Sequence, residues 1–207
     1  MTAPPTSAIL IGMSLHGDRG ILVPSVLLLL VVTAGAYGWV LGLDFTGLDA
    51  APLVAANRLD GPRGPLAFAT SEVRAGLEPG VAVYRPFTGL SYGVDHALHG
   101  LRPWGYHLTD LLLHGAVGVL LLLLLRELGA SSLGALPVAL WLAAHPVGLE
   151  VVPALARRAD LWMVVGLLAA LWGWLLREDG RRTGVVLLVA GGLVAPLSKE
   201  PGLALPL

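Results

Sequence analysis

Five apolar runs in this sequence are long enough, or nearly long enough, to cross a lipid bilayer as helices. They cover residues 21–41, 104–125, 133–149, 161–176 and 183–197. A helix of about 20 residues is roughly 30 Å long, which matches the hydrocarbon core of a membrane. Charged residues make up only 13% of the chain and hydrophobic residues 56%, whereas about 25% of the residues in a soluble domain are charged. The sequence therefore predicts an all-α integral membrane protein with about five transmembrane helices.

Composition also excludes several classes of function. The net charge of −1 gives no basis for binding nucleic acid. The chain has no cysteine, which excludes disulfides, thiolate zinc sites and cysteine nucleophiles. The preference for Leu, Ala, Gly, Val and Arg over Ile and Lys is typical of a GC-rich bacterial genome. We expect a multi-pass protein of the inner or plasma membrane, in contact with membrane lipid.

Outside the five runs, we expect a flexible leader over residues 1–20 and one long loop over residues 42–103. The run 21–41 is too long for the apolar part of a signal peptide, so it predicts a retained first span. A structureless loop of about 60 residues would be unusual in a compact domain, so we expect short helices near residues 52–59 and 87–99. The second is amphipathic and suits the membrane interface. Its apolar face carries Phe87, Leu90, Val94 and Leu98.

Arginines near the span ends place the N-terminus in the cytoplasm, so that residues 42–103 lie outside. Nearly every residue suited to chemistry then falls at one membrane face, the extracytoplasmic one. A structural bundle has no reason for this clustering, but a membrane enzyme with its site at the lipid–water boundary does. The clustered residues are Asp49, Tyr84, Arg85, Pro86, His107, Asp110, His145, Glu150, Arg158, Asp160, Ser198, Lys199 and Glu200.

Each tract also has a purely structural interpretation. Asp49, a few positions after a membrane exit, suits a general base, but aspartate also favours the N-cap of a helix. Arg85 offers a planar fork for a phosphate or carboxylate, or it anchors the chain at the interface. Lys199, at another membrane exit, is either a cation of the site or a snorkelling anchor.

His107, Asp110 and His114 are spaced by three and four residues, which places them on one face of a helix. The two histidines are roughly 10 Å apart along the axis, so one metal ion would be held by an adjacent pair rather than by all three. The alternative, which the spacing favours, is a mutually hydrogen-bonded stripe facing the bundle interior.

A further group flanks the short connection between the third and fourth runs. His145 and Glu150 precede the connection, and Arg158 and Asp160 follow it. An acid, a base and a cation are therefore forced close together. The structural alternative is an ion pair of Arg158 with Glu150 or Asp160.

Taken in order, these tracts resemble the multi-spanning GT-C glycosyltransferases related to protein O-mannosyltransferases, especially the branch with tetratricopeptide repeats after the membrane domain. The resemblance runs from about Phe45 to the end of the chain. The matching tracts are Leu48-Asp49 with Asn57, Tyr84-Arg85-Pro86-Phe87-Thr88 with Ser91-Tyr92, Trp104 to His114, His145-Pro146-Val147 with Glu150, Arg158 to Leu161, and Ser198-Lys199-Glu200.

The resemblance implies transfer of a sugar, mannose above all, from a polyprenyl-phosphate donor to a protein or other hydroxyl acceptor at the extracytoplasmic membrane face. In the family an acidic residue in the first external loop is the catalytic base, and the matching residue is Asp49. A carboxylate is suited to this role because it takes the hydroxyl proton as the new bond forms. The lipid-linked donor is a substrate, so no cofactor is implied, and a divalent metal is left open.

The departing lipid phosphate needs cations to stabilise its charge, and the candidates are Arg85, Arg158 and Lys199. Other polar residues of the same face are candidates for positioning the donor or acceptor. They are Tyr84, His107, Asp110, His145, Glu150, Asp160 and Glu200.

The chain departs from the family pattern at several positions. Ala50 stands where a second acid is common, Asp110 where asparagine is usual, Gly148 where a histidine is usual, and Arg157 where glycine is usual. Family members also have many more spans. We therefore expect residues 21–207 to be an N-terminal part of a GT-C transmembrane domain.

Two other functions remain alternatives at this stage. A small transporter or channel component would use His107, Asp110 and His114 as an ion path, and it requires a polar track across the whole bilayer. A non-catalytic membrane remnant would show no transfer at all.

Overall fold

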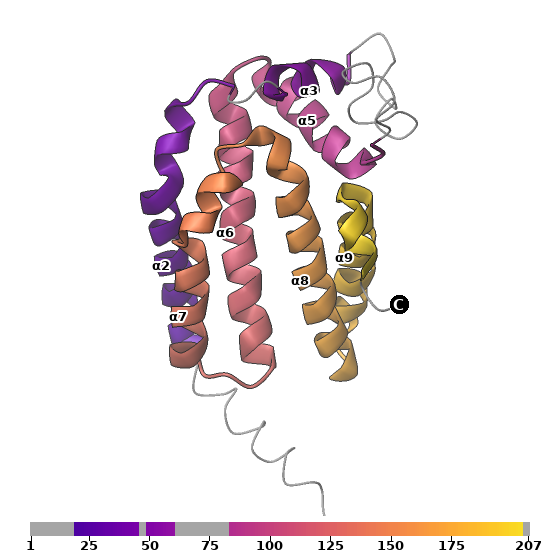
Figure 1. Cartoon of the computed structure of the whole chain (residues 1–207). Helices are drawn as coiled ribbons and strands as arrows, with labels where there is room; N and C mark the ends of the chain where they lie inside the picture. Colours follow the sequence, from indigo (N-terminus) through magenta and orange to yellow (C-terminus); the bar gives the residue numbers. More distant parts are fainter. Residues whose placement is uncertain (1–18, 46–48, 61–82, 205–207) are drawn as a thin grey trace, which may run out of the picture.

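The computed structural model describes residues 19–45, 49–60 and 83–204. Most of the expected leader (residues 1–18), Leu48 and a large part of the expected loop (residues 61–82) lie outside the described residues. The regular elements within the described ranges are helical (Figure 1). They are α2 (Arg19–Tyr37), η1 (Gly38–Gly42), α3 (Ala50–Ala56), α5 (Pro86–His99), α6 (Pro103–Glu127), α7 (Ser132–Ala143), η2 (Pro146–Glu150), η3 (Leu155–Arg157), α8 (Arg158–Glu178), α9 (Arg182–Ser198) and η4 (Glu200–Ala204).

Four helical segments are long and apolar enough to cross a membrane. They are Gly20–Gly42, Pro103–Glu127, Ser132–Glu150 and Leu155–Glu178. The prediction of an all-α membrane protein is thereby confirmed. The fifth apolar run forms α9, which has 17 residues and is shorter than these four segments.

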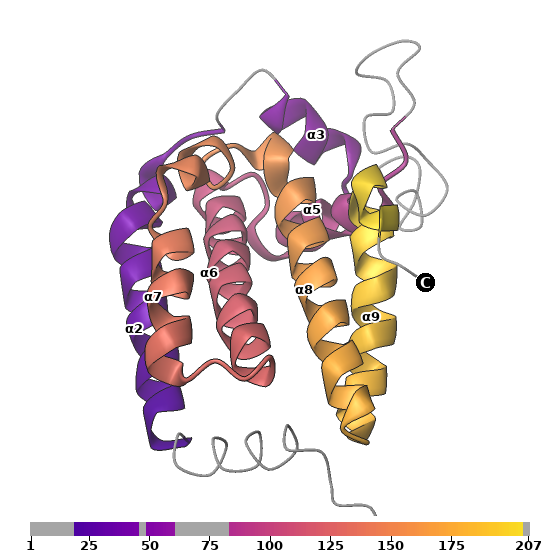
Figure 2. The ribbon, with the colours of Figure 1, turned by 60° about the horizontal axis from the view of Figure 1, so that its bottom comes forward.

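Helix α6 is the centre of the bundle. It packs against α2 and α7 on one side and against α8 on the other, and α9 covers α8 from outside. Helices α3 and α5 lie across one end of the bundle, at the top of Figure 1. Figure 2 shows the same arrangement from a tilted direction, with α3 and α5 beside the first turns of α8 and the last turns of α9. We call this end the α5 end, and the other the opposite end.

Local sequence explains where these helices stop. The turns after α6 and α8, at the opposite end, each contain a glycine with positive φ, Gly129 at 95° and Gly180 at 75°. Both make the hydrogen bonds of a Schellman motif, from Ala130 N to the Leu125 oxygen and from Arg181 N to the Leu176 oxygen, each 3.0 Å. At the α5 end, α7 stops after 12 residues, just before Pro146.

Small residues bring α8 and α9 into direct backbone contact. A methyl group on Gly166 would lie 2.6 Å from the backbone nitrogen of Ala195, and one on Gly191 would lie 2.6 Å from that of Ala170. Close approach of this kind is how membrane helices gain packing energy without a hydrophobic driving force. The α8–α9 pair is therefore a rigid support for the charged residues at its α5 end.

Helix α5 turns its polar face inward. Ser91, Tyr92 and Asp95 are buried, whereas the apolar Val94 and Leu98 are exposed. An exposed apolar face and a buried polar face suit a helix that lies in the membrane interface and covers a polar cluster. The polar face of α5 is the starting point for the candidate site.

Candidate functional site

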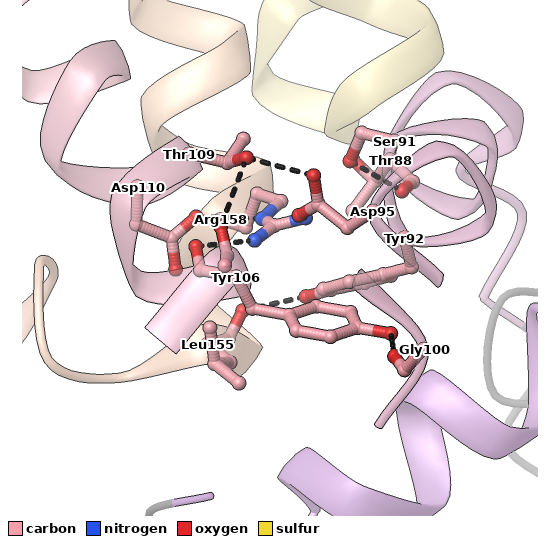
Figure 3. A network of polar contacts seen from close by, with 11 residues as sticks. Thr88, Ser91, Tyr92, Asp95, Gly100, Tyr106, Thr109, Asp110, Leu155 and Arg158 are labelled. Atoms are coloured by element: carbon pink, nitrogen blue, oxygen red, sulfur yellow. Dashed lines mark hydrogen bonds and ion pairs between the residues drawn. The ribbon is translucent and has the colours of Figure 1, made fainter. Parts of the chain in front are cut away.

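Arg158, the first residue of α8, is the centre of a buried polar network at the α5 end (Figure 3). Its side chain is fully buried. Its Nε lies 2.6 Å from Asp110 Oδ1, its Nη1 lies 2.6 Å from Asp95 Oδ2, and its Nη2 donates to the Tyr106 carbonyl at 2.8 Å. The guanidinium also stands over the Tyr92 ring, 4.6 Å from the ring centroid. The network therefore joins α5, α6 and α8 through one cation.

The network determines how accessible Arg158 is. Every nitrogen of the guanidinium has a protein acceptor, and none reaches the surface. Removing one partner of a buried ion pair costs about 3–5 kcal/mol, because the other charge is left uncompensated. In this arrangement Arg158 is a structural cation and is closed to an external phosphate. Its partners also differ from the structural alternative, in which it would pair with Glu150 or Asp160.

Asp95 is the charged member of this network that the sequence analysis did not single out. Its Oδ2 binds Arg158, and its Oδ1 accepts a 2.7 Å hydrogen bond from Thr109, so both oxygens are used. The available signal was the helical spacing, since Asp95 lies three residues after Tyr92 and four after Ser91, on the polar face of α5.

Two tyrosines carry the network outward to α3. Tyr92 donates to the Leu155 carbonyl at 2.5 Å, and Tyr106 donates to the Gly100 carbonyl at 2.7 Å. Burial raises the pKa of Tyr92, so its hydroxyl stays protonated as a donor. The rings of both tyrosines pack in one cluster with Ala50 and Val54 of α3. The network thus supports the helix that begins next to Asp49.

A second group of ion pairs lies at the same end but nearer the surface. Arg85, just before α5, makes a bidentate pair with Glu200, with Nε–Oε1 and Nη2–Oε2 distances of 3.0 and 2.7 Å. Lys199 makes an ion pair with Asp160 in the first turn of α8. Between them, Thr88 donates to the Ser198 carbonyl at 3.1 Å. The Ser198-Lys199-Glu200 tract therefore fastens the end of α9 to α5 and α8.

An apolar groove is lined by residues that precede and follow this tract in the chain. It has a volume of about 810 Å³ and runs between α8, α9 and η4. Pro196, Gly202 and Leu203 form one part of it, close along the chain to Lys199 and Glu200. Leu171, Trp174, Val189 and Leu193 line the rest, and Arg177 lies towards the opposite end. Lys199, which is partly exposed, therefore lies between groove residues along the chain, and its neighbour Glu200 joins the same segment to Arg85.

The stripe of His107, Asp110 and His114 does not form one connected group. His107 Nε2 lies 3.1 Å from the Asp44 carbonyl, Asp110 binds Arg158, and His114 Nε2 lies 3.2 Å from the Ala143 carbonyl. The three side chains are buried, as predicted, but the expected mutual hydrogen bonds are wrong because each side chain reaches a different element. Within the described ranges, no group of three or more His, Asp or Glu residues could hold a metal ion.

The remaining candidates lie in or beside the short elements of the same end. Asp49 occupies the N-cap position of α3, but its side chain makes no capping hydrogen bond. Tyr84 and Glu150 are exposed. His145 precedes η2, where its Nδ1 accepts from Val147 N at 3.1 Å and its carbonyl accepts from the buried Tyr37 hydroxyl.

Comparison with known proteins agrees with the resemblance of the tracts. Protein O-mannosyl-transferase TMTC2 of Mus musculus is 35% identical over 109 residues, which are 45% of this chain and 13% of the mouse protein. Protein O-mannosyl-transferase Tmtc1 of Drosophila melanogaster is 34% identical over 118 residues, 56% of this chain and 14% of the fly protein. The chain is similar to a part of each of these protein O-mannosyl-transferases.

Protein O-mannosyl-transferase TMTC3 of Mus musculus is a third relative, 33% identical over 124 residues that are 58% of this chain and 13% of that protein. The match therefore spans only a small part of each relative's length. These relatives are animal proteins, and the bacterial source suggested by residue usage stays a prediction. No family model matches the chain, and no solved structure matches it.

Proposed function

We propose that this chain is part of a glycosyltransferase that moves a sugar, mannose by the names of its relatives, from a polyprenyl-phosphate donor to a protein hydroxyl. The observation that carries the proposal is that the end of α9 joins two surface cations to an apolar groove: Lys199 and the Arg85 partner Glu200 lie, along the chain, between the groove residues Pro196 and Gly202. An amphiphile with a phosphate headgroup needs both features side by side: cations for the headgroup and an apolar surface for the chain. The relatives named as protein O-mannosyl-transferases support the reaction class.

Asp49 is the general base in this proposal. The acceptor oxygen attacks the anomeric carbon, the bond from that carbon to the phosphate oxygen breaks, and the hydroxyl proton passes to the Asp49 carboxylate. One observation supports this choice over a capping role: the Asp49 side chain does not cap α3. The next position, Ala50, is fully buried against the tyrosine cluster, so a second carboxylate there would be buried.

The phosphate leaves with the electron pair of the broken bond and is stabilised by Arg85 and Lys199. A bidentate arginine and a lysine point charge are the two usual protein partners of phosphate. Arg158, given the same role on sequence grounds, is reassigned as a positioning residue because its guanidinium is fully engaged.

The other polar residues of the α5 end are proposed to position donor or acceptor. Exposed Tyr84 and Glu150 suit contacts with the acceptor, and His145 suits the same role from the start of η2. His107 and Asp110 act indirectly, through Asp44 and Arg158. Asp160 and Glu200 are the counter-ions of the phosphate-binding cations. We place the α5 end at the extracytoplasmic face, with the N-terminus in the cytoplasm.

The described residues do not favour a transporter. The buried charged side chains among them, Asp95, Asp110 and Arg158, all belong to the network at the α5 end. Buried Ser25 and Thr33 lie on α2, outside the network, and donate to carbonyls of their own helix, Ile21 and Leu29. An ion path would need polar groups along the whole bundle.

The test is transfer from a polyprenyl-phosphate mannose to a protein acceptor in membranes, comparing the wild type with Asp49→Asn. Loss of a positioned general base lowers the rate about 10²- to 10⁴-fold. Asp179→Asn is the matched control, because it makes the same chemical change in the turn at the opposite end and should leave transfer unchanged. Equal, nonzero rates for wild type and Asp49→Asn would refute the base assignment, and absence of transfer from all three would favour a non-catalytic remnant.

A further inference from the structure

The two surface cations of the α5 end are already occupied by protein carboxylates. Arg85 is held by both oxygens of Glu200, and Lys199 is held by Asp160. A carboxylate and a phosphate can each present two acceptor oxygens to a guanidinium, so they compete for the same nitrogens. A donor phosphate that binds Arg85 through Nε and Nη2 has to displace Glu200, and a phosphate on Lys199 competes with Asp160 for the ammonium group.

The exposure of the pairs shows which carboxylate gives way. The Glu200 side chain is 58% exposed, whereas that of Arg85 is 21% exposed. The hydrogen bonds from Arg85 lower the pKa of Glu200, and the charge of Lys199 acts in the same direction, so Glu200 is ionised when the donor arrives. Because Glu200 faces solvent, it can swing away without leaving a buried charge behind.

The Arg85–Glu200 pair and the Lys199–Asp160 pair are linked through the backbone. Lys199 and Glu200 are adjacent residues between α9 and η4, and the Thr88–Ser198 hydrogen bond holds this segment beside the N-terminus of α5. Release of Glu200 from Arg85 therefore removes one of two side-chain links between this segment and α5. The groove part formed by Gly202 and Leu203 belongs to the same η4 segment.

We propose that Glu200 and Asp160 act as exchangeable counter-ions, which occupy Arg85 and Lys199 until the phosphate of the lipid-linked donor replaces them. This inference rests on the proposed function, since it takes the two cations as the donor-phosphate site. It adds that Glu200 opposes donor binding, although it lies in the site. Removing its charge strengthens binding of a phosphate lipid, which a residue that simply positions the donor would not do.

The experiment measures the dissociation constant of farnesyl phosphate, a short analogue of the lipid product, for the full chain in detergent. Glu200→Gln keeps the shape of the side chain and removes its charge. We expect it to lower the dissociation constant about three- to fivefold, the range that an exposed ion pair supplies. Asp160→Asn should give a smaller gain through Lys199, because the Asp160 side chain is only 26% exposed and gives way less readily. Inorganic phosphate, which lacks the apolar tail, should bind more weakly but show similar fold gains, and farnesol, which lacks the phosphate, should show none.

Two control variants separate counter-ion exchange from a general loss of negative charge. Asp60→Asn removes an exposed carboxylate near α5, where Asp60 lies 3.7 Å from His96. Glu127→Gln removes the partner of Arg181 in a pair of the same chemistry at the opposite end. Neither should change the dissociation constant. In an Arg85→Ala background, the gain from Glu200→Gln should disappear.

The outcomes distinguish this inference from the proposed function. If Arg85→Ala and Lys199→Ala weaken binding about tenfold or more while Glu200→Gln leaves it unchanged or weaker, counter-ion exchange is refuted and the donor site stands. If Glu200→Gln and Asp60→Asn strengthen binding equally, the gain is a general charge effect and the inference is again refuted. If Arg85→Ala and Lys199→Ala have no effect, the donor site itself is wrong, and the inference fails with it.

Discussion

The α5 end contains two kinds of ion pair, both between an arginine and carboxylates, which differ in burial. Arg158 is buried with Asp95 and Asp110, at nitrogen–oxygen distances of 2.6 Å, whereas Arg85 pairs with a Glu200 side chain that is 58% exposed. An exposed pair contributes about 0–1 kcal/mol, but breaking a buried one costs about 3–5 kcal/mol. The buried network is therefore suited to hold the site in place, and the surface pairs are suited to exchange with a ligand.

The largest expected effect is on the buried network. Arg158→Met leaves Asp95 and Asp110 without their cation, so the free energy of unfolding should fall by about 3–5 kcal/mol. The neighbouring Arg157 is the matched control, because its side chain is 60% exposed and its Asp160 contact is long, at 3.9 Å. Arg157→Met should change stability by less than about 0.5 kcal/mol. Denaturation of both variants in detergent checks the difference, and equal stabilities would show that Arg158 is not a structural cation.

A smaller effect is expected where the network supports α3. Tyr92→Phe removes the hydroxyl that donates to the Leu155 carbonyl, leaving a buried acceptor without its partner. The cost should be about 1–2 kcal/mol. Trp39→Phe is a suitable comparison, since it removes the hydrogen bond of an exposed side chain to the Ala36 carbonyl. If Tyr92→Phe lowers the free energy of unfolding no more than Trp39→Phe does, the Tyr92 hydroxyl does not support α3.

The smallest effect concerns the surface pair. Glu200→Gln should destabilise the fold by less than about 1 kcal/mol in low salt, and the loss should vanish near 1 M salt, where the Debye length is about 3 Å. The destabilisation by Arg158→Met should persist at both salt concentrations, because its partners are buried. Melting temperatures of the two variants against ionic strength measure this contrast. If the loss of stability caused by Glu200→Gln does not depend on salt, the Arg85–Glu200 pair behaves like the buried Arg158 pairs and not like an exposed pair.

The fold class was predictable because a bilayer sets the length of the apolar runs that cross it. The start of α5 at Pro86 also followed from local sequence, since proline favours the first helical turn. The third run was harder: its helix α7 stops at Ala143, and a 3₁₀ helix carries the chain to Glu150. Local sequence therefore predicts where a helix begins or ends better than it predicts which other helices it packs against.

The division between buried and exposed cations was not predictable. Arg157 and Arg158 are adjacent and identical in type, yet one side chain is 60% exposed and the other fully buried. The rotation of α8 decides which one points inward, and this is set by packing against α5 and α6. The role of Asp95 in the network was not predictable for the same reason, because its partner Arg158 is 63 positions away in the chain.

The most direct test of the account is sugar transfer by an Arg85→Ala, Lys199→Ala double variant. The assay follows transfer from a polyprenyl-phosphate mannose to a protein acceptor, in membranes that hold equal amounts of folded protein. The account predicts a loss of about 100-fold or more, because the leaving phosphate has lost both stabilising cations. Arg181→Ala with Arg182→Ala removes two cations from the opposite end and should transfer at the wild-type rate. Transfer at the wild-type rate by the Arg85→Ala, Lys199→Ala variant would contradict the account.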